Sequence, residues 1–314
     1  MISIQAPAKI NLFLEVTGKL PNGYHELATL FAKISLADIL HIQATPATQE
    51  NIRFTITGPL GNQLSAGEDN LVIGAVRVFE QYYHLPLQID ITLEKHIPMG
   101  AGLGGGSSDA GTVLRALCKL FDKNPLDLLP YAAKLGADVP LFLYPDTFLK
   151  GEGIGERLTP IQAKGNLPWV VLVYPDTAVP TKGVFGRLKL PSQKEILTNL
   201  SNLDKLIEYV KEGQPFTQWH TLFFNRLEEA VLPFVCSVRD VKQDFLALGT
   251  NPLMSGSGST VFALTTDRKR ADDLAGKLNR KGQKVFVVQF RGTTDADNRN
   301  SDPFDGRRAP QSLC

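Results

Sequence analysis

The sequence has little of what would place it in several large protein classes. Its 314 residues contain only three cysteines, Cys118, Cys236 and Cys314, with no CxxC pair and no histidine at ligand spacing, so neither a disulfide framework nor a zinc site is favoured. No apolar run approaches the roughly 18 residues of a membrane span. The 33 Lys and Arg balance the 32 Asp and Glu, and a formal net charge of +1 does not attract a polyanion. We therefore expect reduced thiols, no membrane and no nucleic-acid partner.

The two ends of the chain differ in composition. Strand-like sequence begins at once with Ile2-Ser3-Ile4, without a basic-then-apolar leader or an Arg- and Ser-rich transit segment, so a cytoplasmic location is expected. Residues 291–314 contain four Arg, four Asp, two Pro and almost nothing apolar. Because so few apolar groups cannot offset the entropy of ordering, we predict a disordered tail over 291–314.

The patterning in between predicts about two domains, since domains average roughly 150 residues. In the first part, alternating segments predict strands, and Gly136 ends the last of three apolar stripes at helical spacing. Asp69 is a plausible cap of the first of these helices. The expected elements of this part are strands at 9–17, 53–57 and 88–95, and helices at 70–84, after Ser107, and at 125–135.

A near-continuous apolar strand at 169–174 restarts the pattern after a glycine-rich stretch at 151–155. Counting the following helical group as one crossover gives the order β-α-β-β-α-β of a ferredoxin-like unit. We predict an α+β chain with an N-terminal mixed α/β domain at 1–160 and a ferredoxin-like domain at 161–290. The expected later elements are helices at 194–211, 217–232, 237–248 and 268–281, and strands at 252–255, 260–264 and 284–290.

The most informative segment is Pro98-Met99-Gly100-Ala101-Gly102-Leu103-Gly104-Gly105-Gly106-Ser107-Ser108-Asp109-Ala110. Five glycines in seven residues let backbone N–H groups converge on a ligand, and the helix that follows adds its unpaired N–H groups and positive dipole end. The pattern predicts a phosphate cradle, in which the two serines are helix caps, phosphate donors or magnesium ligands. A flexible hinge loop is the alternative.

Two better-known phosphate loops fit this segment less well. A P-loop requires GxxxxGK[ST], and no lysine follows these glycines. Gly100, Gly102 and Gly105 satisfy GxGxxG, but Pro98 intervenes, and a dinucleotide-binding unit has its loop directly after its first strand. A nucleoside triphosphate is therefore favoured over a dinucleotide.

Six motifs spread along the chain are Ala6–Leu12, Asn22–His25, Pro98–Asp109, Leu135–Pro140, Gly151–Glu156 and Met254–Ser259. Together they resemble the superfamily named for galacto-, homoserine, mevalonate and phosphomevalonate kinases (GHMP kinases), and within it the family of 4-diphosphocytidyl-2-C-methyl-D-erythritol kinases. The resemblance implies the two-domain GHMP kinase architecture and transfer of phosphate from ATP, with Mg²⁺, to the 2-hydroxyl of that cytidine diphosphate-linked methylerythritol. This reaction belongs to the non-mevalonate route to isoprenoids. A monomer or weak homodimer is expected.

The resemblance implies that Asp138 and Lys9 are the catalytic pair. Asp138 is the candidate base for the acceptor hydroxyl, although a turn carboxylate after Gly136 is the simpler interpretation of this position alone. Lys9 lies in an otherwise apolar strand, where an exposed lysine would be ordinary, and the resemblance puts it beside Asp138. Asn11 shares its strand face by the period of two and is expected at the acceptor.

The same resemblance implies a cytidine site. Tyr24 would stack on the cytosine, His25 would bind the base edge, and Phe185, in the segment that starts at Thr181, would cover the opposite face. A plain hairpin turn after Asn22-Gly23 would also explain the first two residues. Gly256 and Ser257 would face the substrate diphosphate, or would simply form a hairpin.

For ATP, the resemblance implies a binding set dominated by the glycine-rich segment. Asn70 would lie near the adenine, although helix capping is a sufficient explanation for it. The magnesium ligands stay open, with Ser107 as a candidate. Two rivals are another GHMP kinase with a mevalonate- or homoserine-type acceptor, and a non-catalytic sensor. The complete implied set for ATP is Pro98, Met99, Gly100, Ala101, Gly102, Leu103, Gly104, Gly105, Gly106, Ser107, Ser108 and Asn70.

Overall fold

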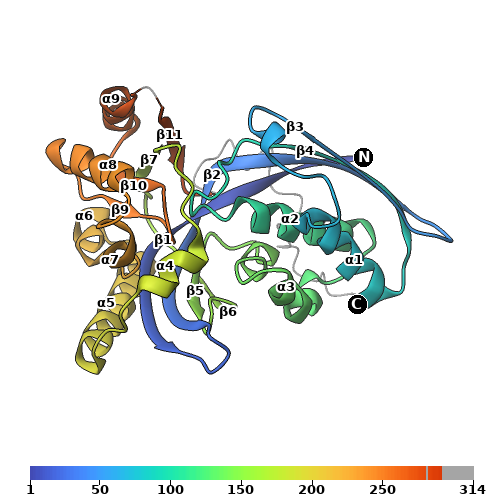
Figure 1. Ribbon diagram of the computed structural model, residues 1–314, viewed down its shortest axis with the longest axis horizontal. Coiled ribbons are helices and arrows are strands. Elements are labelled where there is room, and N and C mark those ends of the chain that lie inside the picture. Colours follow the sequence, from blue (N-terminus) through green and yellow to red (C-terminus); the bar gives the residue numbers. More distant parts are fainter. Residues whose placement is uncertain (281, 292–314) are drawn as a thin grey trace, which may run out of the picture.

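A computed structural model describes residues 1–280 and 282–291. The tail predicted at 291–314 therefore falls outside the described residues, apart from Arg291. Within these ranges, no helix has both the length and the apolar character needed to cross a membrane. Two β-sheets with their helices form the two halves of the molecule, and the long strands β1 and β2 run between them (Figure 1).

The first sheet is built around a long antiparallel hairpin of β1 (Ile2–Lys19) and β2 (His25–Pro46). Gly23 adopts φ 88° in the connecting turn, so the hairpin predicted at Asn22-Gly23 is confirmed. The order is β3-β4-β2-β1-β8, and β5 and β6 continue from the other part of β2. The remaining strands of this sheet are β3 (Asn51–Thr57), β4 (Leu87–Glu94), β5 (Phe148–Glu152), β6 (Arg157–Ile161) and β8 (Phe224–Asn225).

Helices α1 (Leu71–Tyr83), α2 (Gly105–Leu120) and α3 (Leu129–Leu135) cover this sheet on the right of Figure 1. The apolar stripes predicted for α1 and α2 pack into one buried core with β4. The prediction of Asp69 as the cap of α1 is wrong, because Asp69 accepts a hydrogen bond from Ser65 and the side chain of Asn70 caps the helix. Short 3₁₀ helices are η1 (Gly61–Gln63), η2 (Pro125–Leu128), η3 (Pro140–Leu143) and η4 (His220–Leu222).

The second sheet has the order β11-β7-β10-β9, and every neighbouring pair is antiparallel. Numbered along the chain, this is 4-1-3-2, so the predicted ferredoxin-like arrangement and the α+β class are confirmed. Its strands are β7 (Trp169–Tyr174), β9 (Leu253–Met254), β10 (Val261–Thr265) and β11 (Lys284–Gln289). The helices of this half are α4 (Thr181–Arg187), α5 (Gln193–Glu212), α6 (Phe216–Trp219), α7 (Glu228–Val231), α8 (Cys236–Ala247) and α9 (Arg268–Leu278).

The single helix predicted at 217–232 is wrong. The segment contains α6, η4, the strand β8 and then α7. In β8, Phe224 and Asn225 pair in parallel with Phe13 and Leu14 of β1, and the rings of Phe13 and Phe224 are 5.6 Å apart. Pairing with a sheet edge keeps these residues extended in spite of their helical spacing, because tertiary contacts override weak local preferences.

The two halves share a core and a buried ion pair. Side chains of β1, β2, β7, α5 and β10 belong to one apolar cluster. Glu15 of β1, which is 0% exposed, accepts two hydrogen bonds of 2.8 Å from the guanidinium of Arg226, which directly follows β8 and is 5% exposed. Because β8 belongs to the first sheet, the second half of the chain contributes to both sheets. The domain boundary at 160 and 161 stays a prediction.

Removing one member of this buried pair will destabilise the fold. Arg226→Met leaves the carboxylate of Glu15 buried without its cation, which costs about 3–5 kcal/mol in the free energy of unfolding. Urea denaturation measures this free energy. The control is Arg268→Ala, which breaks an exposed ion pair with Asp272 in α9 and costs less than about 1 kcal/mol. Equal losses in both variants would contradict a stabilising role for the buried pair.

Candidate functional site

The ammonium of Lys9 and the carboxylate of Asp138 meet although they are far apart in the sequence. Nζ of Lys9 lies 3.3 Å from Oδ2 of Asp138, and their side chains are 6% and 31% exposed. Lys9 points from β1 between two irregularities in its pairing with β2, and Asp138 lies in the turn between α3 and η3. Such irregularities redirect side chains next to functional sites. The structure therefore brings together the two residues predicted as the catalytic pair.

A short chain of hydrogen bonds fixes the polar side chains around Lys9. Its Nζ donates to Oδ1 of Asn11 at 2.9 Å, and Nδ2 of Asn11 donates to the hydroxyl of Thr29 at 2.9 Å. Thr29 in turn donates to the carbonyl of Phe13. The amide of Asn11 is thus oriented with its oxygen toward the ammonium. Sequence reasoning missed Thr29, because only the pairing of β1 with β2 places it here.

The glycine-rich segment forms a tight loop that leads into α2. Gly100, Gly102 and Gly104 adopt φ of 61°, 75° and 69°, and α2 begins at Gly105 with Gly104 as its cap. Helix capping by Ser107 or Ser108 is therefore wrong, since both serines lie in the first turn and the cap makes no side-chain hydrogen bond. The left-handed conformation that starts the helix is readily available to glycine.

Three consecutive carbonyl groups of this loop accept hydrogen bonds from other parts of the protein. The loop residues alternate in and out of the left-handed region, an arrangement typical of backbone concavities that bind anions. This geometry, together with the N-terminus of α2, supports the predicted phosphate cradle, which stays a prediction. The carbonyls of Ala101, Gly102 and Leu103 accept from the Thr260 amide (3.1 Å), the Ser255 hydroxyl (3.0 Å) and the Lys9 amide (2.9 Å).

A second glycine turn, 255–259 between β9 and β10, packs directly against this loop and against Lys9. A Cβ atom added to Gly102 would lie 2.1 Å from the carbonyl oxygen of Ser255, and one added to Gly256 would lie 3.3 Å from Nζ of Lys9. Asn225 holds the turn, since its Nδ2 donates to the carbonyls of Met254 and Gly256. Sequence reasoning did not identify Asn225, and its position at the end of β8 gave no signal.

The residues predicted for cytidine lie in three segments that meet. The rings of His25 and Phe185 stack with centroids 5.1 Å apart, which brings the β1–β2 turn against α4. The hydroxyls of Thr181 and Ser257 are 2.8 Å apart and join α4 to the second glycine turn. Partial burial, together with Lys19 nearby, lowers the pKa of His25, so its ring is neutral at neutral pH. Tyr24 is 58% exposed at the turn. Binding of a base by these residues stays a prediction.

The two remaining predicted residues, Asn70 and Ser107, take different places. Asn70 accepts from the Val72 amide and donates to the carbonyl of Ser65, so its capping role is confirmed, whereas its contact with adenine stays a prediction. Ser107 is half-buried, and a Cβ atom added to Gly136, two residues before Asp138, would lie 3.7 Å from its Oγ. Residues 1–280 and 282–291 contain no group of three His, Cys, Asp or Glu side chains that could hold a metal ion by themselves.

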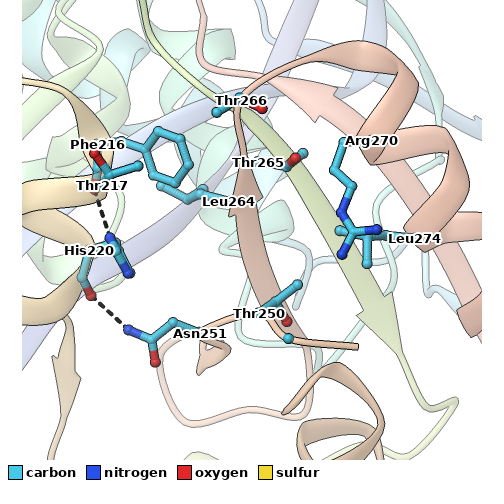
Figure 2. A pocket seen from close by; sticks show the side chains of 11 residues that line it. Phe216, Thr217, His220, Thr250, Asn251, Leu264, Thr265, Thr266, Arg270 and Leu274 are labelled. Carbon is cyan, nitrogen blue, oxygen red and sulfur yellow. Dashed lines mark hydrogen bonds between the residues drawn. The ribbon is translucent and has the colours of Figure 1, made fainter. Parts of the chain in front are cut away.

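A hollow of about 270 Å³ in the C-terminal half lies away from this constellation (Figure 2). It is lined at Thr265 and Thr266, which lie toward the opposite end of β10 from the second glycine turn. Three of its polar side chains already have partners: His220 with the Phe216 carbonyl, Asn251 with the His220 carbonyl, and Arg270 with the Leu248 carbonyl and Asp273. The candidate site is therefore the constellation around Lys9.

The chain matches known kinases along most of its length. The sequence models of the GHMP kinases N terminal domain and the GHMP kinases C terminal domain match residues 70–146 and 196–284. Proteins named 4-diphosphocytidyl-2-C-methyl-D-erythritol kinase are similar: that of Lachnoclostridium phytofermentans is 38% identical over 92% of this chain and 97% of its own, and that of Geobacter sp. strain M21 is 37% identical over 89% and 95%.

Solved structures agree with these relatives. A crystal structure of 4-(cytidine 5'-diphospho)-2C-methyl-D-erythritol kinase has a TM-score of 0.73 and 34% identity, and the match covers 92% of this chain and 98% of that one. Homoserine kinase from Cytophaga hutchinsonii has a TM-score of 0.72 at 20% identity, with 93% and 96% covered, which shows a common fold. From its sequence relatives and its structure, the chain belongs to the 4-diphosphocytidyl-2-C-methyl-D-erythritol kinases, a family of GHMP kinases.

Proposed function

We propose that the chain transfers the γ-phosphoryl group of ATP to the 2-hydroxyl of 4-diphosphocytidyl-2-C-methyl-D-erythritol, in the non-mevalonate route to isoprenoids. The observation that carries the proposal is the convergence of the Lys9–Asp138 pair with the phosphate loop. Phosphoryl transfer needs an acceptor hydroxyl held in line, a partner for its proton and positive groups near the phosphate oxygens. These three requirements correspond to residues that the fold brings together here.

On the acceptor side, the carboxylate of Asp138 receives the proton of the hydroxyl. Its Oδ2 already lies beside the ammonium of Lys9, which orients the carboxylate and offsets negative charge that develops on the transferred group. Asn11 fixes the direction of the ammonium. Most of the rate enhancement then comes from positioning, since the loose transition state of phosphoryl transfer requires little covalent participation by the protein.

On the donor side, the loop from Pro98 to Gly106 holds the phosphates of ATP. A Cβ atom at Gly102 would collide with the carbonyl of Ser255, and one at Gly104 would crowd the side chain of Lys9, which leaves backbone amides as the groups that reach the ligand. Mg²⁺ would be held chiefly by phosphate oxygens, because it keeps several waters and needs only one or two protein ligands. Ser107, beside the turn that carries Asp138, is the nearest candidate ligand. Such an ion would neutralise charge on the β- and γ-phosphates.

The cytidine end of the substrate binds at the meeting point of the β1–β2 turn and α4. The exposed ring of Tyr24 stacks on the base, and neutral His25 offers both a donor and an acceptor to the base edge. Phe185 covers the other face. Thr181 and Ser257, which are hydrogen-bonded to each other, lie where the substrate diphosphate would contact the amides of the second glycine turn.

Loss of either catalytic side chain will abolish turnover without abolishing ATP binding. Asp138→Asn removes the proton acceptor and Lys9→Ala removes the cation, so kcat falls by more than about a hundredfold in each. Single-turnover kinetics gives the rate, and calorimetric titration with a non-hydrolysable ATP analogue gives the affinity, which stays within about threefold of wild type. The control is Asp146→Asn, which changes a carboxylate that accepts a hydrogen bond from Gln162, and this variant keeps wild-type kcat. An unchanged kcat in Asp138→Asn would contradict the assignment of Asp138 as the proton acceptor.

Loss of an aromatic ring at the cytidine end will weaken binding of the substrate alone. Tyr24→Ala and Phe185→Ala each raise KM for the cytidylated substrate by about tenfold or more, since stacking of a base contributes about 1–3 kcal/mol. The KM for ATP stays the same. Tyr82→Ala, at a half-exposed tyrosine of α1, is the control. Equal increases in KM for both substrates would mean that these rings stabilise the fold and do not bind the cytidine. Efficient turnover of mevalonate or homoserine instead would support the rival GHMP kinases.

A methyl group in the phosphate loop will block ATP binding. Gly102→Ala meets a φ of 75° and a carbonyl oxygen 2.1 Å from its Cβ, so the loop must move and its amides lose their alignment. Affinity for the ATP analogue then falls by at least about tenfold, or about 1.4 kcal/mol. Gly276→Ala is the matched control, because this glycine of α9 has open space around its Cβ position and helix propensity favours alanine. Unchanged affinity in Gly102→Ala would contradict the assignment of the loop.

A further inference from the structure

A triad of buried charged residues, Asp38, Lys95 and Asp109, lies beneath the phosphate loop; we call it the charge triad. The three residues are 0%, 2% and 2% exposed. Nζ of Lys95 contacts Oδ2 of Asp38 and lies 2.7 Å from Oδ2 of Asp109. The three residues come from β2, from the end of β4 and from α2, so a single ammonium joins three elements of the N-terminal half.

The triad fixes the chain on the entry side of the loop. The second carboxylate oxygen of Asp38, Oδ1, accepts hydrogen bonds from the backbone amides of His96 at 2.6 Å and Ile97 at 2.8 Å. These are the two residues that precede Pro98. Hydrogen bonds from backbone amides to a buried carboxylate are charge-assisted and stronger than neutral ones. The start of the loop is therefore attached to β2 through one side chain.

The same triad fixes the exit side. Asp109 lies in the second turn of α2, and a Cβ atom added to Gly105, the first residue of that helix, would lie 3.0 Å from Nζ of Lys95. The ammonium thus lies directly against the start of the helix whose N-terminus faces the phosphates. Because Lys95 holds Asp38 and Asp109 at once, it sets the distance between the two ends of the loop.

Burial of three ionisable groups costs free energy, which argues that the triad does more than fill the core. Apolar side chains of similar volume would often stabilise a fold as well as buried ions do or better. Burial raises the pKa of Asp109, and its Oδ1 has no hydrogen-bond partner among the described residues. An unsatisfied buried oxygen in a native protein calls for an explanation, and here the explanation is that the triad fixes the geometry of the loop.

We propose that the charge triad positions the ATP site: Lys95 ties the entry and exit of loop 98–104 to β2, so that the loop's amides are aligned before ATP binds. The proposal rests on the proposed function of this loop. Lys95 is a positioning residue, since its ammonium faces two carboxylates and acts on the phosphates through the backbone. A preorganised loop spends less binding energy on ordering, which raises the affinity for ATP.

The first test is Lys95→Met, with binding measured separately for each substrate by calorimetry. Without the bridging ammonium nothing joins Asp38 to Asp109, so the two ends of the loop are no longer held at a fixed distance. The Kd of the non-hydrolysable ATP analogue with Mg²⁺ then rises by at least about tenfold, whereas the Kd of the cytidylated substrate stays within about twofold. An unchanged Kd for the ATP analogue in the folded variant would overturn the proposal.

The second test separates bridging from the cost of buried charge. The double variant Lys95→Met with Asp109→Asn removes one cation and one anion, which leaves Asp38 charged with its two backbone donors. The unfolding temperature recovers most of the loss caused by Lys95→Met, but the ATP analogue still binds at least about fivefold more weakly than to wild type, because nothing joins the loop ends. Recovery of the Kd to within about twofold would overturn the proposal. If Lys95→Met alone does not fold, the Kd of the ATP analogue for the double variant tests the proposal.

Arg226→Met is the control for general destabilisation. It removes a cation that is buried to a similar extent, 5% exposed against 2% for Lys95, and that lies outside the contacts of the phosphate loop given above. It lowers the unfolding temperature and leaves the Kd of the ATP analogue within about twofold. An equal loss of ATP affinity in this variant would overturn the proposal. Failure of the wild-type protein to bind the ATP analogue would instead overturn the proposed function.

Discussion

The structure depends on bringing one strand lysine to one turn carboxylate. An ammonium that is 6% exposed on β1 needs a negative partner, and Asp138 supplies it from a turn 129 residues further along the chain. The start of α2 lies close to both partners: a Cβ atom added to Gly104 would lie 3.1 Å from the side chain of Lys9, and one added to Gly136 would lie 3.7 Å from Oγ of Ser107. In the proposed reaction the same pair is the chemical centre, and the contact that stabilises Lys9 would also hold the proton acceptor in place.

Close backbone packing is the second constraint. The phosphate loop, the second glycine turn and Lys9 approach so closely that a Cβ atom at Gly102 would collide with the carbonyl of Ser255. Glycine at these positions is a packing requirement as much as a conformational one. In the proposed function, the amides of this closely packed loop and the ammonium of Lys9 would bind a ligand with several phosphate groups. The charge triad beneath the loop gives this surface a fixed base.

The two halves of the chain complete the site together. The ferredoxin-like half provides the second glycine turn and α4, and β8 returns to the first sheet and places Asn225 where it holds that turn. A shared core and the Glu15–Arg226 pair join the halves. In the proposed function, the donor, acceptor and cytidine roles therefore fall on segments from both halves of the chain.

The sequence by itself determined the α+β class, most helices and strands, the phosphate loop and the pairing of Lys9 with Asp138 through family resemblance. These features are local in period or carried by contiguous motifs such as Gly100–Ser108. The tertiary structure alone decided that residues 224–225 form a strand, that Asn70 and not Asp69 caps α1, and that Thr29, Asn225 and the charge triad support the site. The cap is decided locally, because Asn70 accepts from the amide of Val72 whereas the neighbouring Asp69 accepts from Ser65. The strand, Thr29, Asn225 and the charge triad each depend on a partner distant in the chain, and local sequence periodicity carries no information about which distant backbone groups a side chain will meet.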